Sequence, residues 1–204
     1  GSLILILLII YWNTKILKAN KLLIKAQEEI KLKNIALENL ATTDKLTNIY
    51  NRRKIEEVLK EEMYRSERFD HTFVLILLDI DYFKDVNDTY GHQEGDNALI
   101  KVASVLKQSL RREGDFIFRL GGEEFAAVLP NTSERGALQA AENIRQEIQN
   151  LEYTSANNKR IKFTVSIGIA MLHPQDVDLE AILHKADLAL YSAIILPRPP
   201  IIEC

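Results

Sequence analysis

The chain has 204 residues, of which 47% are hydrophobic and 27% are charged, and its formal net charge is −3. These values fit one globular domain with an appendage, and the near balance of charge excludes the broad basic surface of nucleic-acid-binding domains, so no nucleic-acid partner is expected. The only cysteine is the last residue, Cys204, which excludes a disulfide framework within one chain and agrees with a reducing compartment.

The first segment, residues 3–12 (LILILLIIYW), is almost purely apolar. About ten such residues are too few to span a bilayer, which needs about twenty. The chain does not begin with methionine, so we expect part of a longer protein and interpret residues 1–12 as a truncated transmembrane segment. Tyr11 and Trp12 would lie in the interfacial aromatic belt, and the lysines that follow would lie on the cytoplasmic side. A signal peptide fits less well, and a helix buried in a partner protein is the alternative.

Residues 13–42 contain no glycine or proline, and apolar residues recur every seven positions. One seam consists of Ile16, Leu23, Ile30 and Leu37, and a second of Ala19, Ala26 and Leu40, with Lys33 as a defect. This pattern predicts a coiled-coil signalling helix of about four heptads that forms a parallel homodimer. The alternative is a surface helix that packs against its own domain.

The rest of the chain alternates between helical and strand-like patterns after a polar break at residues 43–53. We expect helices at 52–69, 96–111, 132–151 and 179–194, a buried strand at 73–78, hairpin strands at 115–120 and 125–130, and a strand at 161–170. The polar segment between residues 79 and 96 is expected to be a loop. This order predicts an α+β fold in which helices pack on one central, mostly antiparallel sheet.

Two groups of acids stand out against this framework. Asp79 ends the buried strand, and the Gly121-Gly122 turn of the hairpin runs directly into Glu123 and Glu124. Glycines let the backbone approach a bulky ligand, and adjacent glutamates at the start of a strand point to opposite faces. If the two strands are neighbours, Asp79 and Glu123 converge, and two carboxylates with a backbone carbonyl suit Mg²⁺ that also binds phosphate.

Further polar residues follow Asp79 in the predicted loop. Lys84 offers a point charge for a phosphate, while Asn87 and Asp96 offer a donor and acceptor set for a guanine edge. On their own, a histidine such as His92 and a pair of hairpin acids would more often be solvated surface groups. The combination favours a site for a nucleotide.

Together these segments resemble the GGDEF-domain diguanylate cyclases over about residues 43–193. The matching segments are Asp79-Ile80-Asp81-x-Phe83-Lys84-x-x-Asn87-Asp88, Gly91-His92-x-x-Gly95-Asp96, Arg119-x-Gly121-Gly122-Glu123-Glu124-Phe125, Ala186-Asp187-x-Ala189-Leu190-Tyr191 and, earlier, Asp44-x-Leu46-Thr47-x-x-x-Asn51-Arg52-Arg53. The resemblance implies a fold like nucleotidyl cyclases and polymerase palms, and condensation of two GTP into cyclic di-GMP with release of pyrophosphate. It also implies a catalytic domain at 43–194 that lies in the cytoplasm, beneath an inner-membrane anchor in the longer protein.

The resemblance assigns roles residue by residue. Asp79, the Ile80 carbonyl and Glu123 would bind Mg²⁺ or Mn²⁺, Glu124 would serve a second metal, and Glu123 would also activate the attacking hydroxyl. Substrate would be bound by Phe83, Lys84, Asn87, His92, Asp96, Gly121, Gly122 and Arg198. Arg112 and Asp115 resemble the RxxD inhibitory site that binds the product, cyclic di-GMP; the alternative is a surface ion pair.

The C-terminal tail departs from the family pattern. Ile194 takes the position of a family lysine, and Arg198 stands between prolines, so residues 195–204 form an atypical tail. These departures leave open a second function, a catalytically impaired receptor for GTP or cyclic di-GMP. A third hypothesis is a generic dimerisation module, but it does not explain the pattern of acids and glycines at residues 79–81 and 121–124.

Overall fold

The computed structural model describes the backbone of residues 2–155, 158–174, 188 and 190, and their side chains apart from those of 2–10 and 34–40. The chain divides into two compact units, Gly1–Ala41 and Thr42–Cys204. The helices are α1 (Ser2–Thr42), α2 (Arg52–Phe69), α3 (Phe83–Tyr90), α4 (His92–Ser109) and α5 (Glu134–Gln149). The strands are β1 (Tyr50–Asn51), β2 (Phe73–Ile80), β3 (Phe116–Gly121), β4 (Glu124–Pro130), β5 (Tyr153–Thr154), β6 (Arg160–Ile161) and β7 (Val165–Leu172).

The first unit is the single helix α1, so the predicted N-terminal helix is confirmed and begins earlier than residue 13. Three residues of the predicted seam are exposed in the single chain: Ile16 is 52% exposed, Leu23 57% and Ile30 59%. Within the residues that the structure describes, no helical stretch combines the length and the apolar character that a bilayer crossing requires.

The second unit is built on a five-stranded sheet with the order β1-β3-β4-β2-β7. All neighbouring pairs are antiparallel except β1 and β3, which are parallel. The small strands β5 and β6 pair separately. The predicted α+β fold with a mostly antiparallel central sheet is therefore confirmed.

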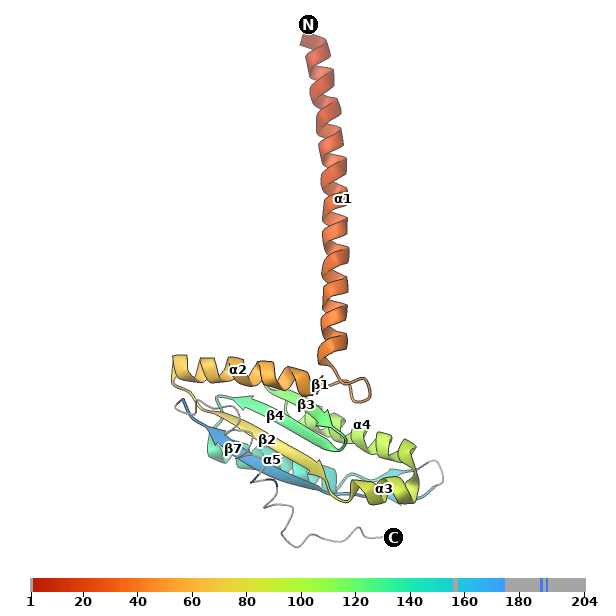
Figure 1. The fold of residues 1–204 in the computed structure, drawn as a ribbon, viewed down its shortest axis with the longest axis vertical. Coiled ribbons are helices and arrows are strands. Elements are labelled where there is room, and N and C mark those ends of the chain that lie inside the picture. The colour runs from red at the N-terminus through yellow and green to blue at the C-terminus, as the bar shows by residue number, and fades with distance from the viewer. Residues whose placement is uncertain (1, 156–157, 175–187, 189, 191–204) are drawn as a thin grey trace. The chain divides into compact units, whose positions relative to one another are not determined.

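Helices cover both faces of this sheet. Along β2, Val74, Ile76 and Leu78 pack in one apolar cluster with residues of α4 and α5, whereas Leu75 and Leu77 pack in another with residues of α2. Alternation of side chains along a strand produces this division. The helices α2 and α5 therefore lie on opposite sides of the sheet (Figure 1), and β2 is buried on both faces, as its continuous apolar run predicts.

Two local expectations are wrong. The segment expected as a loop after β2 contains α3, because Phe83, Val86 and Tyr90 have helical spacing and pack against the core. The expected strand 161–170 is divided: Ile161 pairs with Tyr153 in the small sheet, and β7 begins only at Val165, opposite Ile80. The helix expected at 179–194 lies almost entirely outside the described residues.

Candidate functional site

The register of β2 and β4 brings together the acids singled out in the sequence. These strands are neighbours, and Asp79 is directly opposite Glu124. Leu78, Ile80 and Phe125 pack in the cluster with α4 and α5. Successive side chains of a strand point to opposite faces, so their neighbours Asp79 and Glu124 both point to the face that α2 covers. Directly opposed residues have Cβ atoms about 4.5–5.5 Å apart. The residue facing Asp79 across the strands is thus Glu124, while Glu123 lies next to it in the turn.

The hairpin between β3 and β4 requires glycine at two successive positions, the last residue of β3 and the first residue of the turn. Gly121 has φ 149° and Gly122 has φ 51°, conformations that residues with a Cβ rarely adopt. No atom lies within 4 Å of a Cβ built on either residue. The turn therefore presents bare, exposed backbone beside the two glutamates, which is the surface that the sequence predicted for close approach of a ligand.

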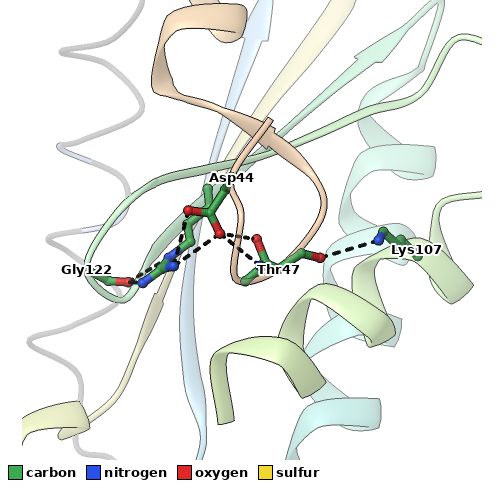
Figure 2. Close-up of polar contacts among 5 residues, drawn as sticks. Asp44, Thr47, Lys107 and Gly122 are labelled. Atoms are coloured by element: carbon green, nitrogen blue, oxygen red, sulfur yellow. Dashed lines mark hydrogen bonds and ion pairs between the residues drawn. The ribbon is translucent and has the colours of Figure 1, made fainter. Parts of the chain in front are cut away.

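A side chain from β3 fastens this turn to the segment that follows α1. Arg119 donates to the Gly122 carbonyl from Nε at 3.1 Å and from Nη2 at 2.9 Å. Its Nη1 donates to the two carboxylate oxygens of Asp44 at 3.1 and 3.3 Å. Figure 2 shows Asp44 and Gly122 joined through this guanidinium, which lies between them. Because the Arg119 side chain is only 14% exposed, water screens these interactions weakly.

Asp44 is itself held in a tight local turn. Its Oδ1 accepts hydrogen bonds from the Thr47 backbone N–H at 2.9 Å and from the Thr47 hydroxyl at 2.6 Å. Lys107 on α4 donates to the Thr47 carbonyl (Figure 2). It also donates to the Asn48 carbonyl. Burial alone would raise the pKa of Asp44, but the hydrogen bonds from Thr47 and Arg119 outweigh it, so this pKa lies below its ordinary value.

The end of β2 is anchored on its other side to β7. Asp81 is 4% exposed, and its carboxylate accepts hydrogen bonds from the hydroxyls of Thr164 at 2.6 Å and Ser166 at 2.7 Å. The next residue, Tyr82, has φ 54°, a left-handed conformation that is unfavourable for a bulky side chain. This sharp change of direction starts α3, which has no side-chain cap at its N-terminus. The first N–H groups of α3 are thus left for another acceptor.

The residues expected to bind a base lie on α3 and α4, which follow each other through Gly91 at φ 92°. Lys84 and Asn87 are on α3, and His92 and Asp96 are in the first turns of α4. Lys84 and His92 are exposed, whereas Asn87 and Asp96 are partly buried. Partial burial gives the latter two fixed positions, and it still leaves them accessible to a ligand.

Arg112 and Asp115 form a local pair before β3. The Arg112 backbone N–H donates to Asp115 Oδ2 at 3.3 Å, and Arg112 Nε lies 3.8 Å from the same oxygen. Burial raises the pKa of Asp115, although Arg112 acts in the opposite direction. The Arg112 side chain is 59% exposed, and its Nη2 donates to the Thr132 hydroxyl at 3.2 Å.

The donors at the end of β2 fit a magnesium-type cation. Mg²⁺ in proteins usually binds one or two carboxylates and takes its other ligands from water and substrate phosphates. Asp79 and Glu124 supply such a pair, and the Ile80 carbonyl follows Asp79 directly. In the part of the chain that the structure describes, no three His, Cys, Asp or Glu side chains cluster closely enough to enclose a metal by themselves.

The structure brings most of the predicted residues to one edge of the second unit, where β2, the β3–β4 turn and α3 meet. Arg198 lies outside the described residues, as do Ile194 and the rest of the tail. Sequence reasoning missed Arg119 as a support of the turn, although Arg119 and Asp44 both belong to quoted motifs. Their pairing across 75 positions had no signal in a single sequence.

Comparisons with known proteins agree with this arrangement. The family model described as "Diguanylate cyclase, GGDEF domain" matches residues 41–194. The chain is 38% identical over 152 residues to diguanylate cyclase DosC of Escherichia coli K12, covering 74% of this chain and 32% of DosC. The chain thus spans about a third of the length of this relative.

Solved structures are similar in fold as well as in sequence. The coiled coil and GGDEF domain of DgcB from Caulobacter crescentus, in complex with c-di-GMP, has a TM-score of 0.76 at 33% identity, covering 84% of this chain and 91% of that one. Diguanylate cyclase SiaD from Pseudomonas aeruginosa, in complex with its activator SiaC, has a TM-score of 0.74 at 34% identity. The match covers 88% of this chain and 68% of the SiaD chain.

Proposed function

The chain belongs to the GGDEF-domain diguanylate cyclase family, and on this premise we propose that it condenses two GTP into cyclic di-GMP with release of two pyrophosphates. The observation that carries the proposal is the register that sets Asp79 opposite Glu124 beside the bare Gly121-Gly122 turn. In this reaction the 3′-hydroxyl of each GTP attacks the α-phosphorus of the other. Positioning and charge stabilisation supply the rate enhancement.

Asp79, the Ile80 carbonyl and Glu123 would hold Mg²⁺ or Mn²⁺, and Glu124, directly opposite Asp79, would serve a second metal. When bound, such a cation neutralises charge that develops on the phosphoryl oxygens. In the described part of the chain, the side chains of Glu123 and Glu124 make no hydrogen bond and no ion pair. Two carboxylates without a partner, at the edge of a rigid sheet, support the proposal that they are metal ligands. Glu123 would also accept the proton of the attacking hydroxyl.

The triphosphate would lie along the start of α3. The uncapped N–H groups there favour an anion, and the ammonium of Lys84 adds a positive charge in the same turn. The exposed backbone of Gly121 and Gly122 leaves room for the nucleotide to lie against the hairpin. Arg198 would be a further contact for the phosphates.

The base would be read between α3 and α4. Asn87 and Asp96 supply a hydrogen-bonding amide and a carboxylate acceptor, which match the N1–H and N2–H₂ donors and the ring acceptors of guanine. Phe83 would support the base, and His92 would lie beside the nucleotide. This set selects guanine over adenine because adenine lacks both of these donors.

Condensation needs two active sites that face each other, so we propose that α1 joins two copies as a parallel coiled coil. The exposed seam residues Ile16, Leu23 and Ile30 support this arrangement, because apolar side chains at heptad spacing favour a second helix. The apolar residues 3–12 support a membrane anchor in the longer protein. Its catalytic domain would then act in the cytoplasm.

Cyclic di-GMP would also bind Arg112 and Asp115 and inhibit the enzyme. A guanidinium can pair with a phosphate or with a guanine edge through two hydrogen bonds, and that of Arg112 is exposed. Since Arg112 already contacts Asp115, the pair is partly preorganised for this role.

The test measures pyrophosphate release from GTP with Mg²⁺, for the wild type and for Asp79→Asn, Glu123→Gln and Glu124→Gln. We expect each variant to lose roughly a hundredfold or more of the rate, the scale for removing one charge-stabilising group. Glu67→Gln, on an exposed part of α2, is the matched control and is expected to keep full activity. Binding of GTP by the wild type without pyrophosphate release would select the receptor function instead.

A further inference from the structure

Gly95 occupies a position in α4 where glycine is not required by the backbone. It lies inside the helix, and glycine in a helix lowers stability relative to alanine. A Cβ at this position would lie 1.9 Å from Asn87 Oδ1, 3.0 Å from Asn87 Cγ and 3.3 Å from Phe83 Cζ. The side chains of two residues on α3 therefore fill the space that any other amino acid would need.

Other glycines of the site have the opposite character. Gly91, Gly121 and Gly122 have positive φ values, and nothing lies within 4 Å of a Cβ built on them. Those glycines allow a backbone conformation. Gly95 provides room, and the atom closest to the vacant Cβ position is the amide oxygen of Asn87.

The position of this amide depends on packing rather than on hydrogen bonds. Among the described residues, the Asn87 side chain has no hydrogen-bond partner. Its carbonyl and its two N–H groups are therefore available to a ligand. What restricts its rotamer is the close contact with Gly95 on one side and the neighbouring ring of Phe83.

We propose that Gly95 is a positioning residue for guanine recognition: the absence of its Cβ lets the Asn87 amide lie against the first turns of α4, next to Asp96, where both can meet one base. This inference rests on the proposed function, which assigns Asn87 and Asp96 to guanine. Gly95→Ala would push the Asn87 amide away from Asp96 without changing a group that contacts the nucleotide.

The first experiment measures equilibrium binding of the α,β-methylene analogues of GTP and ITP with Mg²⁺. These analogues are not condensed, and ITP lacks the 2-amino group. Gly95→Ala is expected to weaken binding of the GTP analogue about tenfold and to reduce the preference over the ITP analogue, as expected for loss of one hydrogen bond. In an Asn87→Ala background, Gly95→Ala should have no further effect. Gly136→Ala, a glycine change in the first turn of α5, is the control that should leave both affinities unchanged.

The second experiment needs no nucleotide. In the Asn87→Ala background, Gly95→Ala should raise Tm by about 2–4 °C because alanine favours the helix. With Asn87 present, the clash should cancel this gain. An equal rise in both backgrounds, or unchanged base preference in Gly95→Ala, would overturn the role of Gly95. Failure of the wild type to bind the GTP analogue would instead overturn the proposed function and the guanine assignment with it.

Discussion

Replacing Arg119 with lysine tests whether the hairpin turn must be held from outside. Lysine keeps the positive charge but has a single ammonium group, so it cannot bridge the Gly122 carbonyl and the Asp44 carboxylate as the planar guanidinium does. We expect the folded chain to keep one of the two contacts and to lose the other.

The magnitude follows from the contacts that are lost. A hydrogen bond to a charged group contributes about 1.5–3 kcal/mol, and the Arg119 and Asp44 side chains are only 14% and 25% exposed. Loss of one side of the bridge should therefore lower the free energy of unfolding by about 1.5–3 kcal/mol. Displacement of Glu123 and Glu124 by a loosened turn should lower kcat by roughly ten- to a hundredfold, since misplacement by an ångström has effects of that size.

The assay combines urea unfolding with steady-state pyrophosphate release. Because the turn positions the acids and lies against the nucleotide, both kcat and kcat/KM for GTP should fall. Arg135→Lys, an exposed arginine on α5, is the matched control and should change neither quantity. If Arg119→Lys is folded and its kcat stays within about twofold of the control, the reasoning that the turn needs this support is refuted.

The remaining predictions concern pH, dimerisation and product binding. The folded-state pKa of Asp44 lies below its ordinary value, so its negative charge stabilises the fold above about pH 4. This contribution disappears as the pH falls through the folded-state pKa. In urea unfolding, Asp44→Asn should have a lower free energy of unfolding than the wild type at pH 7, and the two values should converge in acid. Leu23→Asp with Ile30→Asp places charges in the exposed seam, so sedimentation should show monomers, and rate per chain should fall at low protein concentration; full activity there would exclude dimerisation through α1. Arg112→Ala should relieve inhibition by added cyclic di-GMP with a Tm change of no more than about 2 °C, because this side chain is largely exposed; unchanged inhibition would exclude the RxxD site.

Patterns with a short period were sufficient to predict much of the fold. The apolar spacing of Ile55, Val58 and Leu59 predicted α2 with the bounds that the structure has, and these three side chains are buried. The continuous apolar run from Phe73 predicted a strand buried on both faces. Local periodicity was informative at these places because one element faces a single, large apolar core.

Interactions between distant segments were beyond the reach of the sequence alone. Asp81 is held by Thr164 and Ser166, more than 80 positions later, and nothing in the polar segment after β2 indicated that its carboxylate is buried. The short helix α3 was missed for a related reason. Its Asp and Asn residues favour turns locally, but burial of Val86 and packing of Phe83 against the core override that preference.

The pairing of Asp79 with Glu124 shows how the core determines the geometry of the site. Two negative charges separated by about 5 Å, the Cβ spacing of directly opposed strand residues, repel each other by roughly 1–3 kcal/mol at an effective dielectric constant between 80 and 20. Phe125 and Leu129, on the same strand as Glu124, are 0% exposed, and each large apolar side chain contributes about 1.5–3 kcal/mol on burial. A slip of one residue between β2 and β4 would move both of these side chains from the cluster with α4 and α5 to the face that α2 covers, where the smaller Ala126 and Val128 now pack. The register is therefore fixed by apolar residues outside the site, and the sheet holds the two acids together, which is the arrangement that the proposed cation site requires.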